Sequence, residues 1–491
     1  MARIQVKELS VALPEGLSAA LRAKFLGYGM QEDGGFGLWR PVEGVDRRTA
    51  LVREWVWPER GEVEHHGNIT LSTNYYSRAR ERARELNCGL VIAHSHPGGA
   101  GWQQPSSFDV QNEQDHLGRE IYDLTDLPLV GMILSGEGKW SGRFYEEDFR
   151  GRIRRRECIS VKSIGKFLDV HFNPQMFPSP PLVDSQMRTR TVWGDEKHNN
   201  LCRLRVGLAG FGSVGSLVAE QLARMGIERL RIFDFDSVQV HNLDRLIHAR
   251  AADAKHRMKK VDLGKSWIPF AATSRRFELN PIDGSIVEPA TYQLVLDCDV
   301  VFSCVDMNWP RQVLNHLSYS CGIPVVDGGV SIRVRENGEL QHAVVRAQTV
   351  GPGRACLNCL VMYNSGLIQM ERDGTLANPR YIEQLGEKER RDFEQERQNI
   401  MPFSTLLSGL EVSQFVELCT AMAETGDLGR QQYNFATGEI NPDYTACHSD
   451  CEYARMTFDG SRNLPVLGPD PQKLSVPTPR RSGFRQKKRK H

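Results

Sequence analysis

The sequence predicts an α/β protein of two domains, the second of which contains a mostly parallel sheet. From Leu204 onward, apolar runs such as RLRVGLAG and RLRIFDFD alternate with amphipathic helical segments. Buried strands that alternate with helices are typical of a parallel sheet covered on both faces. A Pro-rich stretch without periodicity, 172–185, separates this pattern from an earlier unit. The length of 491 residues also exceeds what one hydrophobic core usually supports.

The composition is that of an ordinary globular protein and excludes several classes. Hydrophobic residues make up 40% and charged residues 25% of the chain. No apolar run approaches the roughly 18 residues of a membrane span, and the N-terminus lacks the apolar core of a signal peptide. The 11 cysteines are an odd number, which also favours a reducing compartment. We therefore expect a cytoplasmic protein that does not associate with membranes.

The first domain, which we place at 1–170, alternates predicted strands and helices. Apolar runs bounded by Gly, Pro and Asn mark the strands, and charged segments with helical period mark the helices. Strands are predicted over 4–13, 48–57, 89–96, 128–135 and 140–145, and helices over 14–27, over 74–88 and after Ser106.

A linker at 171–186 leads into the second domain, 187–462. A charged, irregular insertion at 362–401 interrupts that domain. The remaining residues, 463–491, are predicted to be a disordered tail. Strands are predicted over 204–210, 229–236, 293–306 and 322–330, and helices over 213–226 and 404–424.

The first constellation of chemically useful residues is His94-Ser-His96-Pro, followed by Ser106 and Asp109. Side chains alternate along a strand, so two His at i and i+2 point the same way and can bind one metal. Asp109, on the next helix, would be the third ligand. Three protein ligands leave a position for water, which is typical of catalytic zinc. The Ser106 hydroxyl would help to stabilise an oxyanion.

This string resembles the motif of the JAMM (JAB/MPN) metallopeptidases, which cleave after the C-terminus of ubiquitin-like proteins. The resemblance implies a JAMM-type α/β domain with catalytic Zn²⁺. In that family a Glu upstream, in a Glu-x-x-Gly stretch that enters a strand, is the general base. Glu32 fits that position, and Glu54 in a later strand is the alternative.

The second constellation is a nucleotide site. Gly210, Gly212 and Gly215 follow a predicted strand and open a helix. Such glycines allow the backbone to approach a phosphate closely, and the helix N-terminus attracts the anion. Taken alone, this stretch would first suggest a dinucleotide. An acidic residue at the end of the second strand, Asp234, suits recognition of a ribose in either case.

The residues that follow, Asp234-Phe-Asp236 and then Asn242-Leu-Asp-Arg245, resemble the signature of the ThiF-type ubiquitin-activating superfamily. The resemblance implies a Rossmann-like adenylation domain that binds ATP and Mg²⁺. Asp234 would hold the ribose, Arg245 and a following Lys the phosphates, and Asp306 the Mg²⁺. Lys260 fits the family Lys best, and Lys259 remains the alternative.

Two further features follow from the same resemblance. Within MRTRTVWG, Arg190 would reach into the ATP site of a partner subunit, which implies a homodimer through this domain. Two cysteine pairs, Cys356 with Cys359 and Cys447 with Cys451, match the structural Zn²⁺ site of the family. Four thiolates suit a closed tetrahedral zinc site.

The sequence departs from the superfamily in one respect, because 360–401 contains no Cys that could form a thioester. Three alternatives stay open. The adenylate passes directly to the nucleophile of a partner, or Ser365 or Thr375 forms an oxyester, or a distant Cys such as Cys202 moves in. We expect the remaining cysteines of the domain, Cys298, Cys304, Cys321 and Cys419, to fill the core.

The combined reading is a bifunctional enzyme, similar to fusions in bacterial ubiquitin-like conjugation systems. One half would adenylate a ubiquitin-like protein for a conjugating-enzyme partner, and the other half would cleave after its C-terminus. Activation and unmasking of a sulfur-carrier protein is one alternative, and a scaffold with reduced catalysis is another.

The charge balance conceals a basic tail. The chain has 62 Lys and Arg against 61 Asp and Glu, but 466–491 holds eight of the former and one of the latter. This tail would be either a solvated terminus or an electrostatic tether for an acidic partner. The rest of the chain does not imply binding of nucleic acid.

Overall fold

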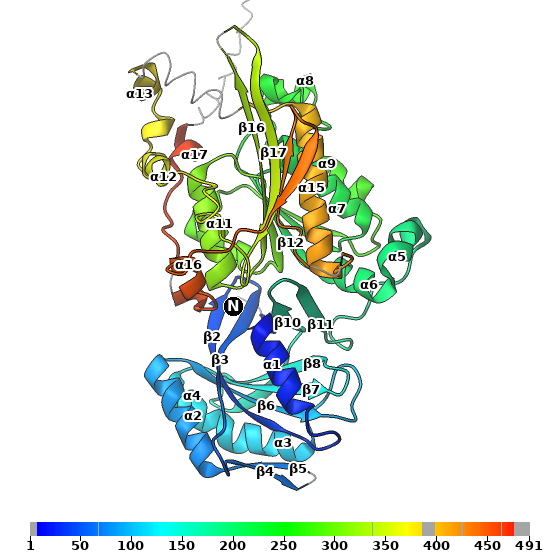
Figure 1. Ribbon diagram of the computed structural model, residues 1–491, viewed down its shortest axis with the longest axis vertical. Coiled ribbons are helices and arrows are strands. Elements are labelled where there is room, and N and C mark those ends of the chain that lie inside the picture. The colour runs from blue at the N-terminus through cyan, green and yellow to red at the C-terminus, as the bar shows by residue number, and fades with distance from the viewer. Residues whose placement is uncertain are drawn as a thin grey trace, which may run out of the picture.

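The computed structural model describes residues 7–66, 68–335, 337–384, 398–423, 426–462 and 464–475. Its described part has two large sheets, one in each half of the chain, stacked along the long axis of the molecule (Figure 1). No helix among the described residues combines the length and apolarity needed to cross a membrane.

The N-terminal half is a nine-stranded sheet with the strand order β11-β10-β1-β3-β2-β6-β7-β8-β9, and a separate hairpin, β4-β5, lies beside it. The bounds are β1 Glu8–Pro14, β2 Gly34–Glu43, β3 Arg47–Val56, β4 Val63–His66, β5 Asn68–Leu71, β6 Gly89–His96, β7 Leu129–Ser135, β8 Trp140–Glu147, β9 Ile153–Glu157, β10 Ser160–Ile164 and β11 Leu168–Phe172.

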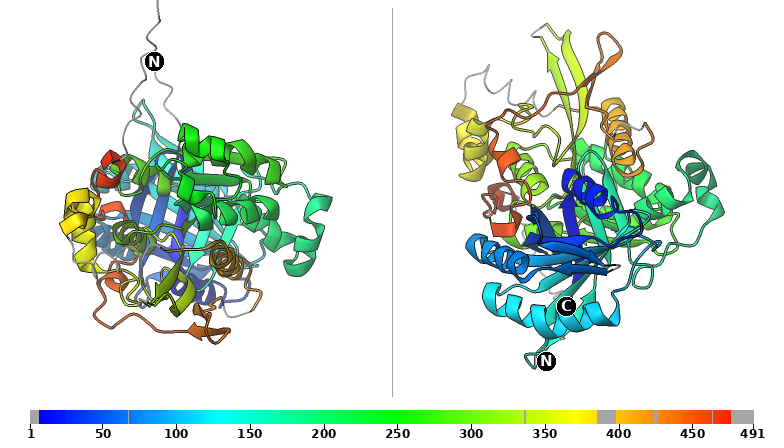
Figure 2. Two further views of the ribbon diagram at one scale, coloured as in Figure 1. Left: turned by 90° about the horizontal axis from the view of Figure 1, so that it is seen from above. Right: turned by 60° about the horizontal axis from the view of Figure 1, so that its bottom comes forward.

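Helices cover both faces of this sheet. On one face α1 buries Leu21 and Phe25 against Trp39, and on the other α2 and α4 bury Tyr75 and Ile121. The helices α2 and α4 lie side by side (Figure 2). The helical bounds are α1 Glu15–Phe25, α2 Thr73–Leu86, α3 Ser107–Gln111, the π-helical turn η1 Asn112–Leu117 and α4 Gly118–Thr125.

The C-terminal half is an eight-stranded sheet with the order β14-β13-β12-β15-β16-β17-β18-β19. Pairing is parallel from β14 to β16 and antiparallel from β16 to β19. The bounds are β12 Arg205–Ala209, β13 Arg229–Phe233, β14 Glu278–Ile282, β15 Val300–Ser303, β16 Val325–Val334, β17 Leu340–Val350, β18 Arg430–Asn434 and β19 Glu439–Asp443.

Helices α7, α9 and α15 lie on one side of this sheet and α11 on the other (Figure 1). The structure thus confirms the α/β class and the Rossmann-like sheet. The helices are α5 Met187–Trp193, α6 Asp195–Arg203, α7 Ser213–Met225, α8 Ala251–His256, α9 Lys260–Ala271, α10 Pro289–Val295, α11 Asn308–Ser320, α12 Ser365–Arg372, α13 Pro379–Gln384, α15 Met401–Thr420, α16 Glu452–Arg455 and α17 Pro471–Ser475, with 3-10 turns η2 Asp184–Gln186, η3 Val240–Asn242, η4 Thr375–Ala377 and η5 Gly460–Arg462.

Three expectations for the C-terminal half are corrected. Of the predicted strand 293–306, only β15 is extended, because the first three residues are the end of α10 and a turn separates the two elements; a short apolar run does not by itself distinguish a helix from a strand. The insertion contains α12, η4 and α13. Part of the predicted tail, 464–475, packs against the domain. The basic residues of the tail beyond 475, and 385–397 of the insertion, lie outside the described residues.

The two halves share a core instead of meeting through a loose linker. The largest apolar cluster contains Val42 and Leu51 of the N-terminal sheet together with Val206 and Val300 of the C-terminal one. Of the predicted linker, 173–183 has no regular element, and the start of the range is still β11.

A buried ionic network also crosses this boundary. The Asp299 carboxylate accepts hydrogen bonds from Arg47 Nη1 at 2.5 Å, from Lys162 Nζ at 2.9 Å and from the Arg205 backbone N at 2.8 Å. Burial alone would raise the pKa of Asp299, but Arg47 and Lys162 hold it well below its usual value. The N-terminal half therefore contacts the starts of β12 and β15, the edge opposite to the carboxyl ends of these strands.

Candidate active sites

The first candidate site lies at the end of β6. His94 and His96 point to the same side of the strand, with their Nε2 atoms 3.2 Å apart, and Asp109 Oδ2 lies 3.7 Å from His94 Nε2. One ligand atom from each of the three residues lies within 4.8 Å of the others. The structure thus brings the three predicted residues together, and their nitrogen and oxygen atoms are the donors of a three-ligand metal site.

A capping box fixes Asp109. The Ser106 hydroxyl accepts from the Asp109 backbone N at 3.1 Å, and Asp109 Oδ2 accepts from the Ser106 backbone N at 2.8 Å. The helix start therefore orients the carboxylate toward His94. Ser106 is exposed, so its hydroxyl remains open to a second partner.

The electrostatics suit a metal ligand and a base. Burial lowers the pKa of His94 to about 4, so its imidazole is neutral at pH 7 and offers a lone pair. Burial and repulsion by Asp109 raise the pKa of Glu32, while His96 lowers it. Glu32 also lies two residues before Gly34, which pairs with His94 across β2 and β6, and this register places it near the triad. Glu54, the alternative base, instead accepts from Arg82 Nε at 3.0 Å on the α2 side of the sheet.

Residues beyond the motif hold the Glu32 loop. The buried Asp33 pairs with Lys24 and with His65 Nε2, the latter at 3.4 Å. His65 belongs to β4, and its ring contacts that of Tyr28 in a tilted arrangement, with the ring centroids 4.8 Å apart. Sequence reasoning missed these contacts because no spacing rule links the hairpin to the loop.

The second candidate site is a cavity of about 940 Å³ at the carboxyl ends of the parallel strands. Eight of the predicted nucleotide residues line it: Gly210, Gly212, Asp234, Asp236, Asn242, Arg245, Lys260 and Asp306. Gly215 supports it from below, because a Cβ there would lie 2.1 Å from the Gly210 carbonyl oxygen. The glycine therefore allows α7 to start directly behind the loop.

Lys260 is paired with two carboxylates of the cavity, Asp234 and Asp236, whereas Arg245 pairs with Asp244 outside the cavity lining. The Asp234 carboxylate accepts from the Phe211 and Asp236 backbone N atoms, both at 2.7 Å. Lys260 Nζ lies 2.7 Å from Asp236 Oδ2, and although burial opposes its charge, Asp234 and Asp236 raise its pKa. Lys259 instead donates to the Phe235 carbonyl and to Asp283. The geometry favours Lys260 over Lys259.

The insertion contributes a residue that the sequence did not reveal. Glu371 of α12 accepts from the backbone N atoms of Asn308 at 3.0 Å and of Trp309 at 2.6 Å. It thereby caps α11 just after Asp306. The separation of about sixty residues leaves no local signal for this contact.

Arg190 does not contribute to the cavity of its own chain. Its Nε donates to Asp195 Oδ1 at 2.8 Å, next to the junction of α5 and α6. A role of Arg190 in the nucleotide cavity of a second chain is therefore a proposal.

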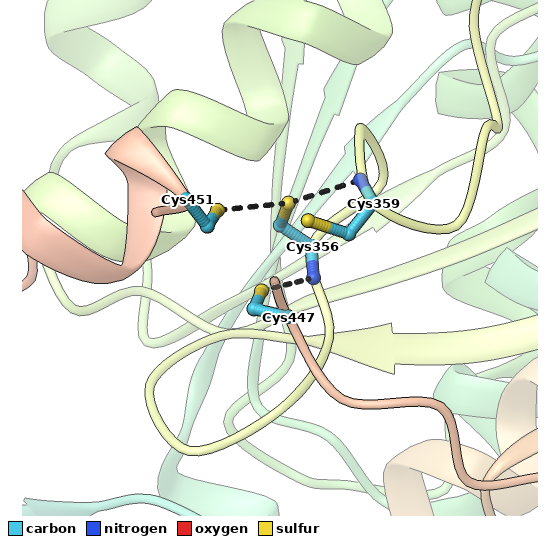
Figure 3. Close-up of side chains that lie close together, drawn as sticks. All are labelled: Cys356, Cys359, Cys447 and Cys451. Atoms are coloured by element: carbon cyan, nitrogen blue, oxygen red, sulfur yellow. Dashed lines mark hydrogen bonds between the residues drawn. The ribbon is translucent and has the colours of Figure 1, made fainter. Parts of the chain in front are cut away.

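The four predicted zinc cysteines gather at one point between the end of β17 and α16 (Figure 3). Their Sγ atoms lie within 4.8 Å of one another, and Cys356 and Cys451 are separated by 3.7 Å. Zn–S bonds of about 2.3 Å in a tetrahedron place sulfur atoms about 3.8 Å apart. The donor set and its spacing fit a structural zinc ion.

The candidate acceptors of an acyl group differ in position. Ser365 lines the cavity, whereas the Thr375 hydroxyl donates to Asp373 at 2.6 Å. Cys202 is buried beside His198, and burial raises its pKa to about 12. Cys304 packs against the core, as expected, and also lines the cavity; burial and the neighbouring Glu411 raise its pKa well above the usual value.

Comparison with known proteins agrees with this geometry. Residues 183–448 match the ThiF family. The ubiquitin-like modifier-activating enzyme 5 of Dictyostelium discoideum is 28% identical over 198 residues, which cover 37% of this chain and 48% of the relative. The molybdopterin-synthase adenylyltransferase of Escherichia coli is 26% identical over 157 residues, 32% of this chain and 58% of the relative. The chain thus spans about half the length of these relatives.

Among solved structures, a crystal structure of E. coli MccB is similar, with a TM-score of 0.42 and 16% sequence identity. The alignment covers 55% of this chain and 74% of MccB.

Proposed function

The chain belongs to the ThiF family, and on that premise we propose that its C-terminal half adenylates the C-terminal carboxylate of a ubiquitin-like protein. The observation that carries this proposal is the cavity, in which residues from four strand ends meet. A carboxylate and a nucleoside triphosphate both fit the polar end of such a site only if cations screen their repulsion. Arg245 and Lys260 supply that charge.

The reaction follows from these positions. The substrate carboxylate attacks the α-phosphorus of ATP, the acyl-adenylate forms, and pyrophosphate leaves. Gly210, Gly212 and the α7 N-terminus face the phosphates, and Asp234 accepts from the ribose hydroxyls. Mg²⁺, which Asp306 would hold, neutralises phosphate charge when bound. Lys260, kept cationic by Asp234 and Asp236, stabilises the charge that develops on the departing oxygen.

Transfer from the adenylate is proposed to go directly to a partner, such as a conjugating enzyme. Of the cysteines that the structure describes, Cys304 alone lines the cavity, and its raised pKa keeps the thiol protonated. A protonated thiol is a poor nucleophile. Ser365 is the alternative acceptor on this chain, because Thr375 is bonded to Asp373.

The N-terminal half is proposed to be a JAMM-type zinc peptidase that cleaves after the same C-terminus. His94, His96 and Asp109 would hold the ion, which supplies an acidified water when bound. Glu32 would take the proton from that water, and its raised pKa suits a group that must later release it. The exposed Ser106 hydroxyl would donate to the developing oxyanion.

We also propose a homodimer through the C-terminal half, in which Arg190 serves the site of the second chain. A related function, activation of a sulfur carrier, is supported by the similarity to a molybdopterin-synthase adenylyltransferase. The two differ in their product, a conjugate in one case and a C-terminal thiocarboxylate in the other.

Intact mass spectrometry distinguishes these outcomes. The full chain is incubated with ATP, Mg²⁺ and candidate ubiquitin-like proteins, with and without a C-terminal extension. Adenylate on the free C-terminus and loss of the extension support both activities. If neither mass change occurs with any candidate, the chain acts as a scaffold.

A further inference from the structure

The C-terminal segment 464–475 returns to the nucleotide cavity. Trp309 Nε1 donates to the Val466 carbonyl at 2.9 Å, and the Gly468 backbone N donates to the Val287 carbonyl at 3.0 Å. Lys473 Nζ lies 2.9 Å from Glu288 Oε2. These three contacts hold the segment on the loop that follows β14 and on the first turn of α11. The segment lies beyond 183–448, the residues that match the ThiF family.

Two residues of this segment, Asp470 and Gln472, line the cavity. Asp470 is only 6% exposed. Its Oδ2 accepts from the Ser285 hydroxyl at 2.6 Å, and its Oδ1 accepts from the Gln472 backbone N at 3.0 Å. A carboxylate accepts about four hydrogen bonds, so Asp470 can accept more from a molecule in the cavity.

The order of the strands shows which part of a nucleotide would meet Asp470. Along the carboxyl edge of the sheet, β12 ends at the Gly210 loop, β13 ends just before Asp234, and β14 ends shortly before Ser285. Phosphate at the first position and ribose at the second place the base at the third. Ser285, which lines the cavity just past the end of β14, donates to Asp470 at 2.6 Å, so Asp470 lies at this third position.

We propose that 464–475 forms the nucleobase subsite of this chain and that Asp470 selects adenine. This assignment rests on the adenylyltransferase proposal and adds which base the nucleotide cavity recognises. The 6-amino group of adenine donates to the Asp470 carboxylate, with Gln472 beside it and Ile286 in the wall. A purine with a carbonyl at C6 presents an acceptor to the carboxylate, and two acceptors repel each other.

Equilibrium binding of ATP and inosine triphosphate to the full chain tests this subsite, because the two purines differ at C6. The wild type should bind ATP about tenfold more tightly or better, the range of one hydrogen bond to a charged group. Asp470→Asn should reduce the preference to about threefold or less, because its amide can donate to the C6 carbonyl.

Asp283→Asn is the matched control. It removes a carboxylate just past the end of β14 that pairs with Lys259 and does not line the cavity, so the ratio of the two affinities should stay as in the wild type. Equal affinity of the wild type for both nucleotides would overturn the subsite, and so would an unchanged ratio in a folded Asp470→Asn variant. A wild type that binds neither nucleotide would instead refute the adenylyltransferase proposal.

Discussion

The two candidate sites are built in different ways. In the N-terminal half, the candidate metal triad comes from one strand end and one short helix, within sixteen consecutive residues, 94–109. In the C-terminal half, the cavity is closed by residues from Ala209 to Gln472. A compact local set suits chemistry at one ion near the surface, whereas a distributed set encloses a large substrate and excludes water from it.

The sites also face away from each other. His94 pairs with Gly34 at the start of β2, whereas Gly44, just past the end of β2, lies against Asp297 at the interface. The ten residues of β2 span about 30 Å. The nucleotide cavity lies at the far ends of β12 and β15 from that interface. The C-terminal tail of one ubiquitin-like protein therefore cannot occupy both sites at once.

Asp306→Asn should cause the largest difference between the activities of the two halves. If Asp306 holds Mg²⁺ as proposed, the substitution should slow ATP–pyrophosphate exchange by about a thousandfold, since the charge on the phosphates is no longer neutralised. Cleavage by the N-terminal half should stay unchanged. Asp283→Asn is the control, because Asp283 pairs with Lys259 outside the cavity. Equal losses in both variants would contradict the assignment.

Glu32→Gln should produce the opposite separation. Cleavage of a ubiquitin-like protein with a C-terminal extension should fall by about a hundredfold or more, the usual contribution of a general base. Bound zinc and pyrophosphate exchange should not change. Glu54→Gln should leave cleavage intact, because Glu54 lies on the α2 side of the sheet. Loss of cleavage in the latter variant alone would reverse the assignment.

Asp299→Asn should weaken both halves together. Leaving Arg47 and Lys162 without their buried carboxylate should lower the free energy of unfolding by about 3 kcal/mol. The folded pKa of Asp299 lies below the unfolded one, so its contribution is present above about pH 4 and is lost as the pH falls. Urea titrations at several pH values should show a flatter acid limb in the variant.

The exposed pair Lys139–Glu196, which joins the same two halves at 2.8 Å, is the control. Glu196→Gln should change the free energy of unfolding by less than about 1 kcal/mol, since solvent screens this pair. A similar loss in both variants would contradict the account of the buried network.

The smallest effect is expected in an experiment that asks whether cleavage and activation of one modifier molecule are coupled. Labelled extended modifier is supplied together with unlabelled processed modifier and ATP. Because the sites face away from each other, processed modifier leaves before it is activated, and the adenylate should carry the label fraction of the free pool. Enrichment of label in the adenylate would show direct transfer between the sites.

The difference between the sites also explains how far sequence reasoning reached. His94, His96 and Asp109 were predictable because strand and helix periodicity fix their mutual placement. The glycine loop and Asp234 were predictable for the same reason. Glu371 and Asp470 were not, because they reach the cavity through tertiary packing from segments far along the chain. The strand predicted over 293–306 was too long, because its apolar run includes the end of α10 and burial alone does not distinguish a helix from a strand.

ATP–pyrophosphate exchange by the full chain, measured with a cognate ubiquitin-like protein, tests the central claim most directly. Exchange should require the free C-terminal carboxylate. With a C-terminally extended modifier, exchange should begin only after the N-terminal half has removed the extension. Glu32→Gln should abolish exchange with the extended modifier and leave exchange with the processed modifier intact. Exchange that is independent of any modifier, or its absence with every cognate modifier, would contradict the account.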